Sequence, residues 1–311
     1  MNYVLFVTSK LGYEMLNLFI KQKCNIILVC IESEHEHEKI KYYKKTILLC
    51  KANNINYILD KSTKQIEDIL NNIDLNKDID YIISFGYRKM ISDNIINSAS
   101  IAALGTHFSP LPRYRGFAPL NWVLINGESE TAVNLFYLNK EVDSGDIVES
   151  KNVKIYYEDD INSLFENCIK VFKNLMKETI PKLEKNNFSS TPQNENDATF
   201  TCSRNPEDGK INWNWNSNKI YNYVRALTDP YPGAFTTIKN RKLYIWSCEE
   251  FKTPKYEGRI PGKVIKLEKD KGVIVLCRDN AVLIKIAQLE NGKKVTADKI
   301  ISSIRVTLGN Q

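Results

Sequence analysis

The sequence lacks several features that would assign it to a special class of protein. Its 311 residues hold no apolar run of the roughly 18 residues that a membrane-spanning helix needs. Its seven cysteines are odd in number and form no C-x-x-C pair, so we expect reduced, buried thiols in a cytoplasmic protein. Residues 1–8 carry no basic stretch before their apolar run, and we expect a first strand there rather than a signal peptide.

Histidine is scarce, and a dinucleotide fingerprint is missing. Two of the three histidines lie in the segment Glu34-His35-Glu36-His37-Glu38, which invites a metal-site interpretation. Histidines two residues apart in a charged loop are more typical of a solvated loop, so we predict no metal. Residues 8–13 contain no G-x-G-x-x-G after the first predicted strand, so a dinucleotide cofactor is not expected.

The charge of the chain is uneven along its length. The net charge is +6, yet residues 201–311 hold 20 basic and 11 acidic residues and so carry +9. A basic segment of this kind suits an anionic partner, either a nucleotide diphosphate or an RNA. A solvated, lysine-rich surface is the alternative interpretation.

The first half of the chain alternates two kinds of segment. Short, nearly all-apolar stretches, which a parallel sheet buried on both faces needs, lie at 2–8, 25–31, 55–59 and 80–85. Stretches with helical period lie between them, at about 10–22, 38–52 and 63–72. This repetition predicts an α/β fold with a Rossmann-like, doubly wound, mostly parallel sheet. Further strands are predicted at 101–104 and 132–138, and a long helix at about 160–185.

The pattern changes in the second half. Residues 186–200 are polar and aperiodic, which indicates a linker or surface loop, and a short helix is predicted near 217–227. Residues 234–311 show short alternating segments separated by turn residues, which predicts a small antiparallel β-barrel of OB-like type. We therefore predict an N-terminal catalytic domain at 1–200 and a C-terminal domain at 201–311.

Polar residues follow the predicted strands at the edge where an open parallel sheet binds ligands. His107 ends one strand, within a loop that two prolines and a glycine make stiff. Asp143 follows the next strand in a Gly-containing turn, and we predict that it faces His107 across the switch point of the sheet. A His–Asp pair is suited to proton transfer near pH 7, whereas a lone loop histidine is more often structural.

These segments resemble the signature of the folate-dependent formyltransferases. The run H-F-S-P-L-P-R-Y-R-G-F-A-P-L-N-W-V-L-I-N-G-E from His107, with D-S-G-D-I-V from Asp143, is similar to the family's conserved loops. Arg204 to Trp213 resembles the family's R-x-P-x-D-G-x-I-x-W linker, and R-A-L and Y-P-G-A-F follow at 225–227 and 231–235. The resemblance implies that a primary amine attacks the formyl carbon of 10-formyltetrahydrofolate and that tetrahydrofolate leaves, without a metal.

The resemblance also implies roles for particular residues. His107 manages the amine proton or the developing oxyanion, and Asp143 fixes the charge and tautomer of His107. The residues that we expect to line the pterin pocket are Phe85, Gly86, Tyr87, Met90, Ile91, Asp143 and Asp146. Ordinary core packing is the alternative for the two aromatic residues among them.

One position departs from the family pattern. The family has an asparagine two residues before the histidine, and this chain has Gly105. Glycine offers no side-chain amide, and the loss of one oxyanion donor typically costs about 10²–10³ in turnover. Either another group replaces that donor, or the activity is weak. The candidate groups are Thr106, the backbone N–H of Gly105, and an asparagine from elsewhere (Asn121 or Asn126).

The substrate-binding residues implied by the resemblance are Arg113, Tyr114, Arg115, Gly116, Arg204, Arg225 and Tyr231. Arg113 and Arg115 suit a clamp on phosphate. The equal alternative is that the Tyr114–Gly116 segment only holds the loop in place.

Three functions compete for the chain. The motifs resemble the sugar-nucleotide branch of the family most, and this implies an amino sugar, such as a dideoxy sugar for lipopolysaccharide O-antigen, and a homodimer. Methionyl-tRNA formyltransferase is the alternative, but its branch usually has a basic loop where Glu32 to Glu38 is acidic and would repel RNA. A non-catalytic RNA-binding relative needs exposed stacking aromatics, for which the barrel offers Tyr244, Trp246, Phe251 and Tyr256.

Overall fold

The computed structural model describes residues 1–34, 40–72 and 79–309. These residues form two compact units. The first comprises Met1–Gly116, Glu130–Lys154 and Glu166–Thr201, and the second comprises Phe117–Ser129, Ile155–Phe165 and Cys202–Gln311. Two inner segments therefore belong to the second unit, which a single boundary at residue 200 cannot represent.

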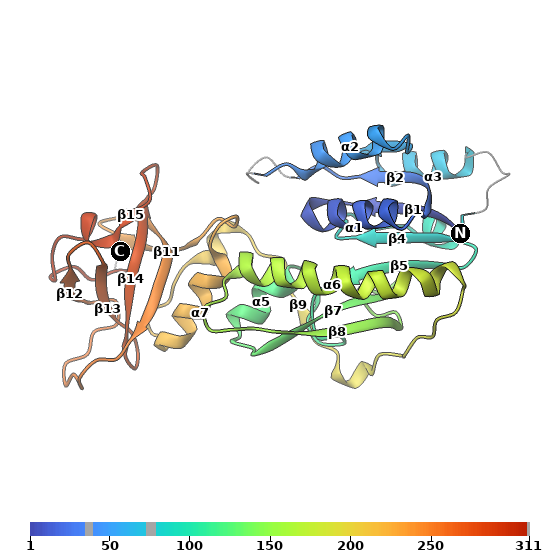
Figure 1. The fold of residues 1–311 in the computed structure, drawn as a ribbon. Coiled ribbons are helices and arrows are strands. Elements are labelled where there is room, and N and C mark those ends of the chain that lie inside the picture. Colours follow the sequence, from blue (N-terminus) through green and yellow to red (C-terminus); the bar gives the residue numbers. More distant parts are fainter. Residues whose placement is uncertain (35–39, 73–78, 310–311) are drawn as a thin grey trace. The chain divides into compact units, whose positions relative to one another are not determined.

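A seven-stranded sheet forms the centre of the first unit, in the order β3-β2-β1-β4-β5-β7-β8 (Figure 1). Its strands are β1 (Asn2–Val7), β2 (Asn25–Ile31), β3 (Tyr57–Leu59), β4 (Tyr81–Phe85), β5 (Ala102–His107), β7 (Glu130–Tyr137) and β8 (Ile147–Lys154). The first five are parallel, whereas β7 and β8 are antiparallel to their neighbours. The predicted mostly parallel, doubly wound sheet is confirmed.

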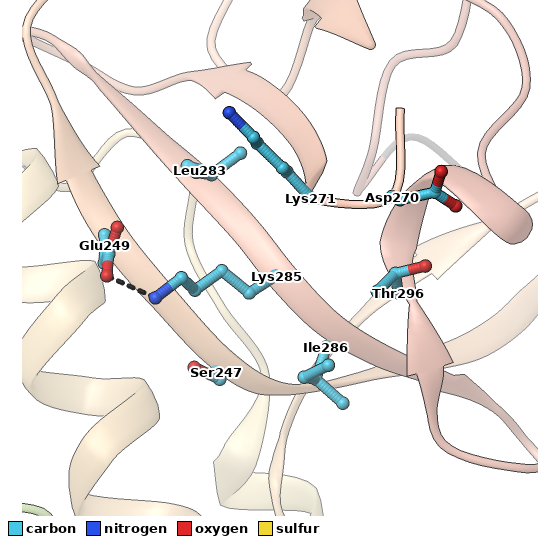
Figure 2. A pocket seen from close by; sticks show the side chains of 8 residues that line it. All are labelled: Ser247, Glu249, Asp270, Lys271, Leu283, Lys285, Ile286 and Thr296. Atoms are coloured by element: carbon cyan, nitrogen blue, oxygen red, sulfur yellow. Dashed lines mark hydrogen bonds and ion pairs between the residues drawn. The ribbon is translucent and has the colours of Figure 1, made fainter. Parts of the chain in front are cut away.

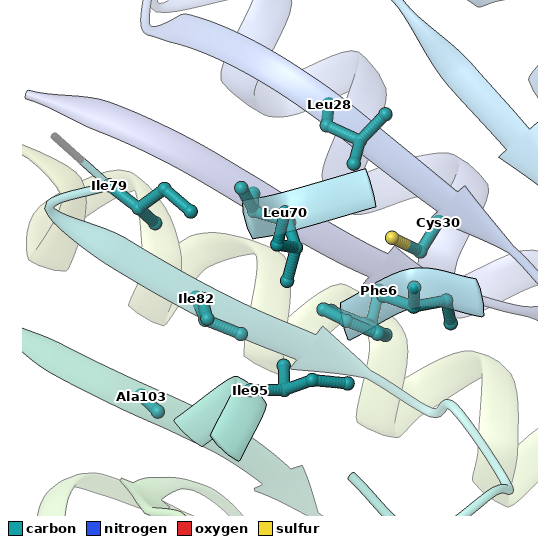
Figure 3. Packing of buried hydrophobic residues seen from close by; sticks show 10 residues of the cluster. Phe6, Leu28, Cys30, Leu70, Ile79, Ile82, Ile95 and Ala103 are labelled. Atoms are coloured by element: carbon teal, nitrogen blue, oxygen red, sulfur yellow. The ribbon is translucent and has the colours of Figure 1, made fainter. Parts of the chain in front are cut away.

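Both faces of this sheet are buried because successive strand residues point to opposite sides. Val4 and Phe6 of β1 face a cluster that includes Leu70 of helix α3 (Thr63–Asn72) and Ile95 of helix α4 (Asp93–Asn97) (Figure 3). On the other face, the aromatic rings of Tyr3, Phe19, Phe85 and Phe172 pack against one another and so join the sheet to α1 (Ser9–Lys21) and α6 (Ile161–Glu184). This alternation explains why the strands read as continuous apolar runs.

The predicted helices are present, with α2 beginning at Tyr42 and ending at Ala52. The sequence pattern missed α4 and the edge strand β8, whose sequence I-V-E-S-K-N-V-K is partly exposed and carries no apolar run. His35 and His37 of the possible metal segment lie outside the described residues. Within the described part of the chain, no group of three or more His, Cys, Asp or Glu residues is placed to hold a metal ion.

The second unit combines two helices with an antiparallel sheet. Helix α5 (Pro119–Ile125) packs on α7 (Ser217–Leu227). The sheet has the order β10-β11-β14-β13-β12, with β15 paired to β14, and its strands are β10 (Ala234–Ile238), β11 (Arg241–Phe251), β12 (Val264–Glu268), β13 (Gly272–Leu276), β14 (Ala281–Leu289) and β15 (Val295–Thr296). The antiparallel character predicted for this region is confirmed.

Two further expectations concern the thiols and membrane segments. All seven cysteines are free, and five are buried, but Cys202 is exposed and Cys24 is half-buried, so the expectation of uniformly buried thiols is wrong for these two. Burial raises the pKa of the Cys50 thiol to about 12. Among the described helices, none has both the length and the apolar character needed to cross a bilayer.

Candidate active site

The structure brings His107 and Asp143 together in the first unit. Nδ1 of His107 lies 3.4 Å from Oδ2 of Asp143, and the two side chains are 8% and 19% exposed. A nearly buried imidazole beside a carboxylate is shielded from water, which strengthens the interaction between the two groups. This geometry suits proton transfer, and the catalytic roles of the two residues stay a prediction.

We expected the two loops to meet because the strands before them would end at the same edge of the sheet, and this expectation is wrong. Strand β7 is antiparallel to β5, and its last residue, Tyr137, lies beside Leu104 rather than beside His107. The ends of these two strands therefore do not meet at one edge. The loop between β7 and β8 instead turns back along the sheet, because the N–H of Tyr137 donates to the carbonyl of Asp146. Asp143 reaches His107 from this reversed loop.

Each group of the pair is held by backbone contacts. Nε2 of His107 lies 2.8 Å from the carbonyl oxygen of Tyr114, and the N–H of Gly116 donates to Oδ2 of Asp143 at 2.8 Å. Both ring nitrogens thus face hydrogen-bond acceptors, and only the doubly protonated ring donates to both. The two contacts fix the orientation of the imidazole ring between the two loops.

Asn134 on β7 fixes the start of the histidine loop, and sequence reasoning missed it. Its amide donates to the carbonyls of His107 (2.9 Å) and Ser109 (2.6 Å), and its oxygen accepts from Ser150 (2.7 Å). Asn134 is only 1% exposed. A polar residue inside the apolar run A-V-N-L-F-Y was the available clue, because a buried amide needs partners.

Hydrophobic side chains fill the space beside Gly105. A Cβ at position 105 would lie 2.6 Å from Cδ2 of Leu138 and 3.1 Å from Cζ of Phe136. The hydroxyl of Thr106 donates to the carbonyl of Ser84 and accepts from the N–H of Gly86. These contacts join β5 to β4, so the Thr106 hydroxyl proton is already engaged.

The two asparagines proposed to replace the missing amide, Asn121 and Asn126, belong to the second unit. Nδ2 of Asn121 donates to the carbonyl of Ala226 within the second unit, and Asn126 ends helix α5 there. Within the first unit, the imidazole of His107 and backbone N–H groups stay the predicted oxyanion donors.

Gly105→Asn is expected to destabilise the protein by about 1–3 kcal/mol, because it overpacks the space that Leu138 and Phe136 occupy. Adding Leu138→Ala removes the nearest obstacle, so the double variant should be more stable than the sum of the two single changes predicts. Urea denaturation of the four proteins measures this coupling. Strictly additive effects would show that Leu138 does not exclude a side chain at position 105.

The residues predicted for the pterin pocket fall into two groups. Phe85 is fully buried between Phe19 and Phe172, which agrees with the alternative that it is an ordinary core residue. Tyr87 packs edge-on against Phe6. Met90, by contrast, is 70% exposed. The remaining members are partly buried and lie in the loops that follow β4 and β7, namely Gly86, Ile91, Asp143 and Asp146.

The arginines predicted to bind substrate differ in accessibility. Arg113 is exposed, with its guanidinium 5.3 Å from the ring centroid of the buried Tyr114. Arg115 is 1% exposed and hydrogen-bonds to Gln193 and Glu195, which favours the loop-holding interpretation for this residue.

The remaining predicted substrate residues lie in the second unit. Arg204 lies between the rings of Trp122 and Tyr223, 5.5 and 5.4 Å from their centroids. The guanidinium of Arg225 donates to the carbonyls of Tyr156 and Asp159, and burial lowers its pKa. Tyr231 is 38% exposed. Substrate contact by these residues stays a prediction.

A separate hollow of about 660 Å³ lies on the antiparallel sheet of the second unit (Figure 2). Its charged lining includes Lys271 and Asp270, and Lys285 pairs with Glu249. Mixed charges on an open surface of this kind select no particular ligand. The chemistry that the structure supports lies at His107 and Asp143 instead.

The first unit thus combines a doubly wound sheet with a histidine–carboxylate pair on neighbouring loops, an arrangement suited to proton transfer. The sequence matches the family model described as "Formyl transferase" over residues 4–180 and that described as "Formyl transferase, C-terminal domain" over residues 204–305. The chain therefore belongs to the formyl transferase family, and the resemblance noted in its motifs is confirmed.

Solved structures with the same fold share less than a quarter of their residues with this chain. HypX from Aquifex aeolicus in complex with tetrahydrofolic acid is 18% identical, with a TM-score of 0.65, over 96% of this chain but 46% of that one. The chain thus spans about half the length of HypX. WlaRD, a sugar 3N-formyl transferase solved with dTDP and 5-N-formyl-THF, is 18% identical (TM-score 0.68; 94% and 99% covered). Methionyl-tRNA formyltransferase from Clostridium thermocellum is 20% identical (TM-score 0.57; 80% and 93% covered).

Proposed function

We propose that the protein transfers the formyl group of 10-formyltetrahydrofolate to the amino group of a nucleotide-linked amino sugar. The observation that carries the proposal is the close approach of the buried His107 to the partly buried Asp143, on loops whose sequences match the family. The amine nitrogen attacks the formyl carbon, and the carbonyl oxygen gains negative charge as the tetrahedral intermediate forms. The imidazole of His107 takes the proton that the amine loses and returns it to the leaving nitrogen as the bond between the formyl carbon and tetrahydrofolate breaks, while Asp143 orients the ring.

The folate donor needs an apolar, partly open surface beside this pair. Met90 and Val142, in the loops after β4 and β7, are 70% and 47% exposed. Large apolar side chains on a surface are suited to cover a flat heterocycle. HypX and WlaRD, which share the fold, were solved with tetrahydrofolic acid and 5-N-formyl-THF. These findings support a folate as the formyl donor.

The acceptor is the less constrained half of the reaction. WlaRD is named a sugar 3N-formyl transferase and was solved with dTDP, and this chain matches 99% of its length. The excess of basic residues at 201–311 supports an acceptor that carries a diphosphate. We further propose that the reaction takes place in the cytoplasm, serves surface-polysaccharide synthesis and is carried out by a homodimer.

An acceptor panel tests the proposal. The purified protein is mixed with 10-formyltetrahydrofolate and thymidine-, uridine- or guanosine-diphosphate amino sugars, with methionyl-tRNA alongside, and the products are weighed by mass spectrometry. The expected result is one added formyl group on a sugar nucleotide. Formylation of methionyl-tRNA alone would replace this assignment by the alternative that the Clostridium structure represents.

A further inference from the structure

Residues 191–201, which we call the clasp, connect the two loops that carry His107 and Asp143. At one end, Thr191 and Ile147 exchange backbone hydrogen bonds of 2.9 and 2.8 Å, next to the Asp143 loop. At the other end, the short strand β9 (Phe200–Thr201) pairs with β6 (Arg115–Gly116), next to the His107 loop. The sequence pattern predicted only a linker or surface loop here.

Gln193 of the clasp makes hydrogen bonds in two directions. Its Oε1 accepts from Nη2 (2.9 Å) and Nε (3.2 Å) of Arg115. Its Nε2 donates to the carbonyls of Asp143 (2.8 Å) and Gly145 (2.7 Å). A guanidinium only donates and a carbonyl only accepts, so the neighbours fix the orientation of the amide. Every strong hydrogen-bonding position of this half-buried side chain is used.

The carbonyls that Gln193 holds belong to a strained turn. Asp143 has a φ of +52°, a left-handed conformation that costs energy in a residue other than glycine. Such a conformation persists only where the surroundings determine it, and the amide of Gln193 binds the carbonyl of Asp143 itself. The position of the Asp143 carboxylate relative to His107 therefore depends on Gln193.

Arg115 anchors Gln193 in turn. Its guanidinium makes paired bonds to Glu195, with Nη2 2.7 Å from Oε1 and Nη1 2.8 Å from Oε2. The hydrogen bonds from Arg115 lower the pKa of the exposed Glu195 carboxyl, so it stays ionised and keeps the guanidinium in place. A continuous set of contacts thus runs from Glu195 through Arg115 and Gln193 to Asp143.

We propose that Gln193 is a positioning residue for the reaction, acting through the backbone of Asp143 rather than by contact with substrate. The proposal rests on the proposed formyl transfer. Gln193 fixes the carboxylate in the orientation that holds the ring of His107. Loss of its amide donor should therefore lower kcat and leave substrate binding largely unchanged.

Gln193→Glu isolates this contact. The carboxylate still accepts from Arg115, but it places an oxygen where the amide donated to the carbonyls of Asp143 and Gly145. We expect kcat to fall about 10–100-fold, because small displacements of reacting groups lower rates by factors of this size. The KM for both substrates should stay within about threefold of that of the parent protein. Gln193→Met removes the amide without adding charge and is expected to act in the same direction.

Gln288→Glu is the matched control in the second unit. There the amide oxygen accepts from Trp246 and Nε2 donates to the carbonyl of Gly292, so the same substitution disrupts the same kind of contact. We expect kcat to remain within about twofold of the parent protein. An equal loss of kcat in both variants would overturn the proposal, as would normal kcat in both Gln193 variants.

A second readout is independent of any acceptor. The chain has three histidines, so a spectrum of protein labelled with ¹⁵N-histidine contains few imidazole signals, and His107→Ala identifies those of His107. Gln193→Glu should shift the His107 signals and leave those of His35 and His37 unchanged. Unchanged His107 signals would contradict the proposal even if no acceptor in the panel were formylated. If Gln193→Glu shifts the His107 signals but the parent protein formylates no acceptor, the proposed reaction is wrong, whereas the effect of Gln193 on the His107 site is supported.

Discussion

Asp143→Asn is expected to lower kcat for formyl transfer by about 10²–10⁴-fold, the range that positioned proton transfer contributes. The substitution removes the charge that faces His107 at 3.4 Å but leaves an oxygen to accept from the N–H of Gly116. Asparagine tolerates the left-handed backbone found at this position (φ +52°). The loss should therefore come from chemistry rather than from folding, and steady-state kinetics at saturating donor and acceptor measure it.

His107→Ala should reduce kcat by a similar or larger factor, because the imidazole itself is the group proposed to move the proton. The histidine is 7% exposed, so its removal also leaves a cavity, and Asp143→Asn is the cleaner of the two variants. Thermal unfolding serves as the control, with a Tm expected within a few degrees of the parent protein for Asp143→Asn. Near-normal turnover of a folded Asp143→Asn protein would show that this pair is not the catalytic one.

Gly145→Ala is expected to displace the Asp143 loop and to lower kcat by at least about 100-fold, as misplaced reacting groups do. A Cβ at position 145 would lie 1.9 Å from the carbonyl oxygen of Tyr137 and 2.8 Å from its carbonyl carbon. Backbone atoms of β7, a strand paired on both sides, cannot move aside as the end of a flexible side chain can. The loop must move instead, and with it the carbonyls that Gln193 binds.

Gly258→Ala is the matched control for this change. A Cβ at position 258 would meet no heavy atom within 4 Å, so kcat and Tm should both stay close to those of the parent protein. Kinetics and differential scanning calorimetry on the two variants test the expectation. If the Gly145→Ala protein had the same kcat as the Gly258→Ala protein, the Asp143 loop would be shown to tolerate displacement.

The sequence predicted the parts of the fold that depend on burial. Strands β1, β2 and β4 are covered on both faces, and their continuous apolar runs follow from that. The edge strand β8 has polar residues at most positions, so its hydrogen bonds to β7 left no pattern to recognise. Strand direction was equally hidden, because an apolar run such as that of β7 does not tell parallel from antiparallel pairing.

The site was predictable where its residues carry reactive groups. His107 and Asp143 were predicted as a pair from residue type, loop composition and family motifs, and the structure brings them together. Gln193 was not, because it lies in a polar, aperiodic stretch, and its function depends on contacts with residues about 50 and 78 positions away. Positioning residues of this kind become visible only when the structure shows which hydrogen bonds they complete.

The most direct test of the account is the release of tetrahydrofolate, followed by absorbance, with 10-formyltetrahydrofolate in the presence and absence of a nucleotide-linked amino sugar. The account predicts rapid release that requires the amino sugar in the parent protein and is lost in Asp143→Asn. Release that is equally fast in Asp143→Asn, or no release with any amino sugar although the protein binds the folate, would contradict it.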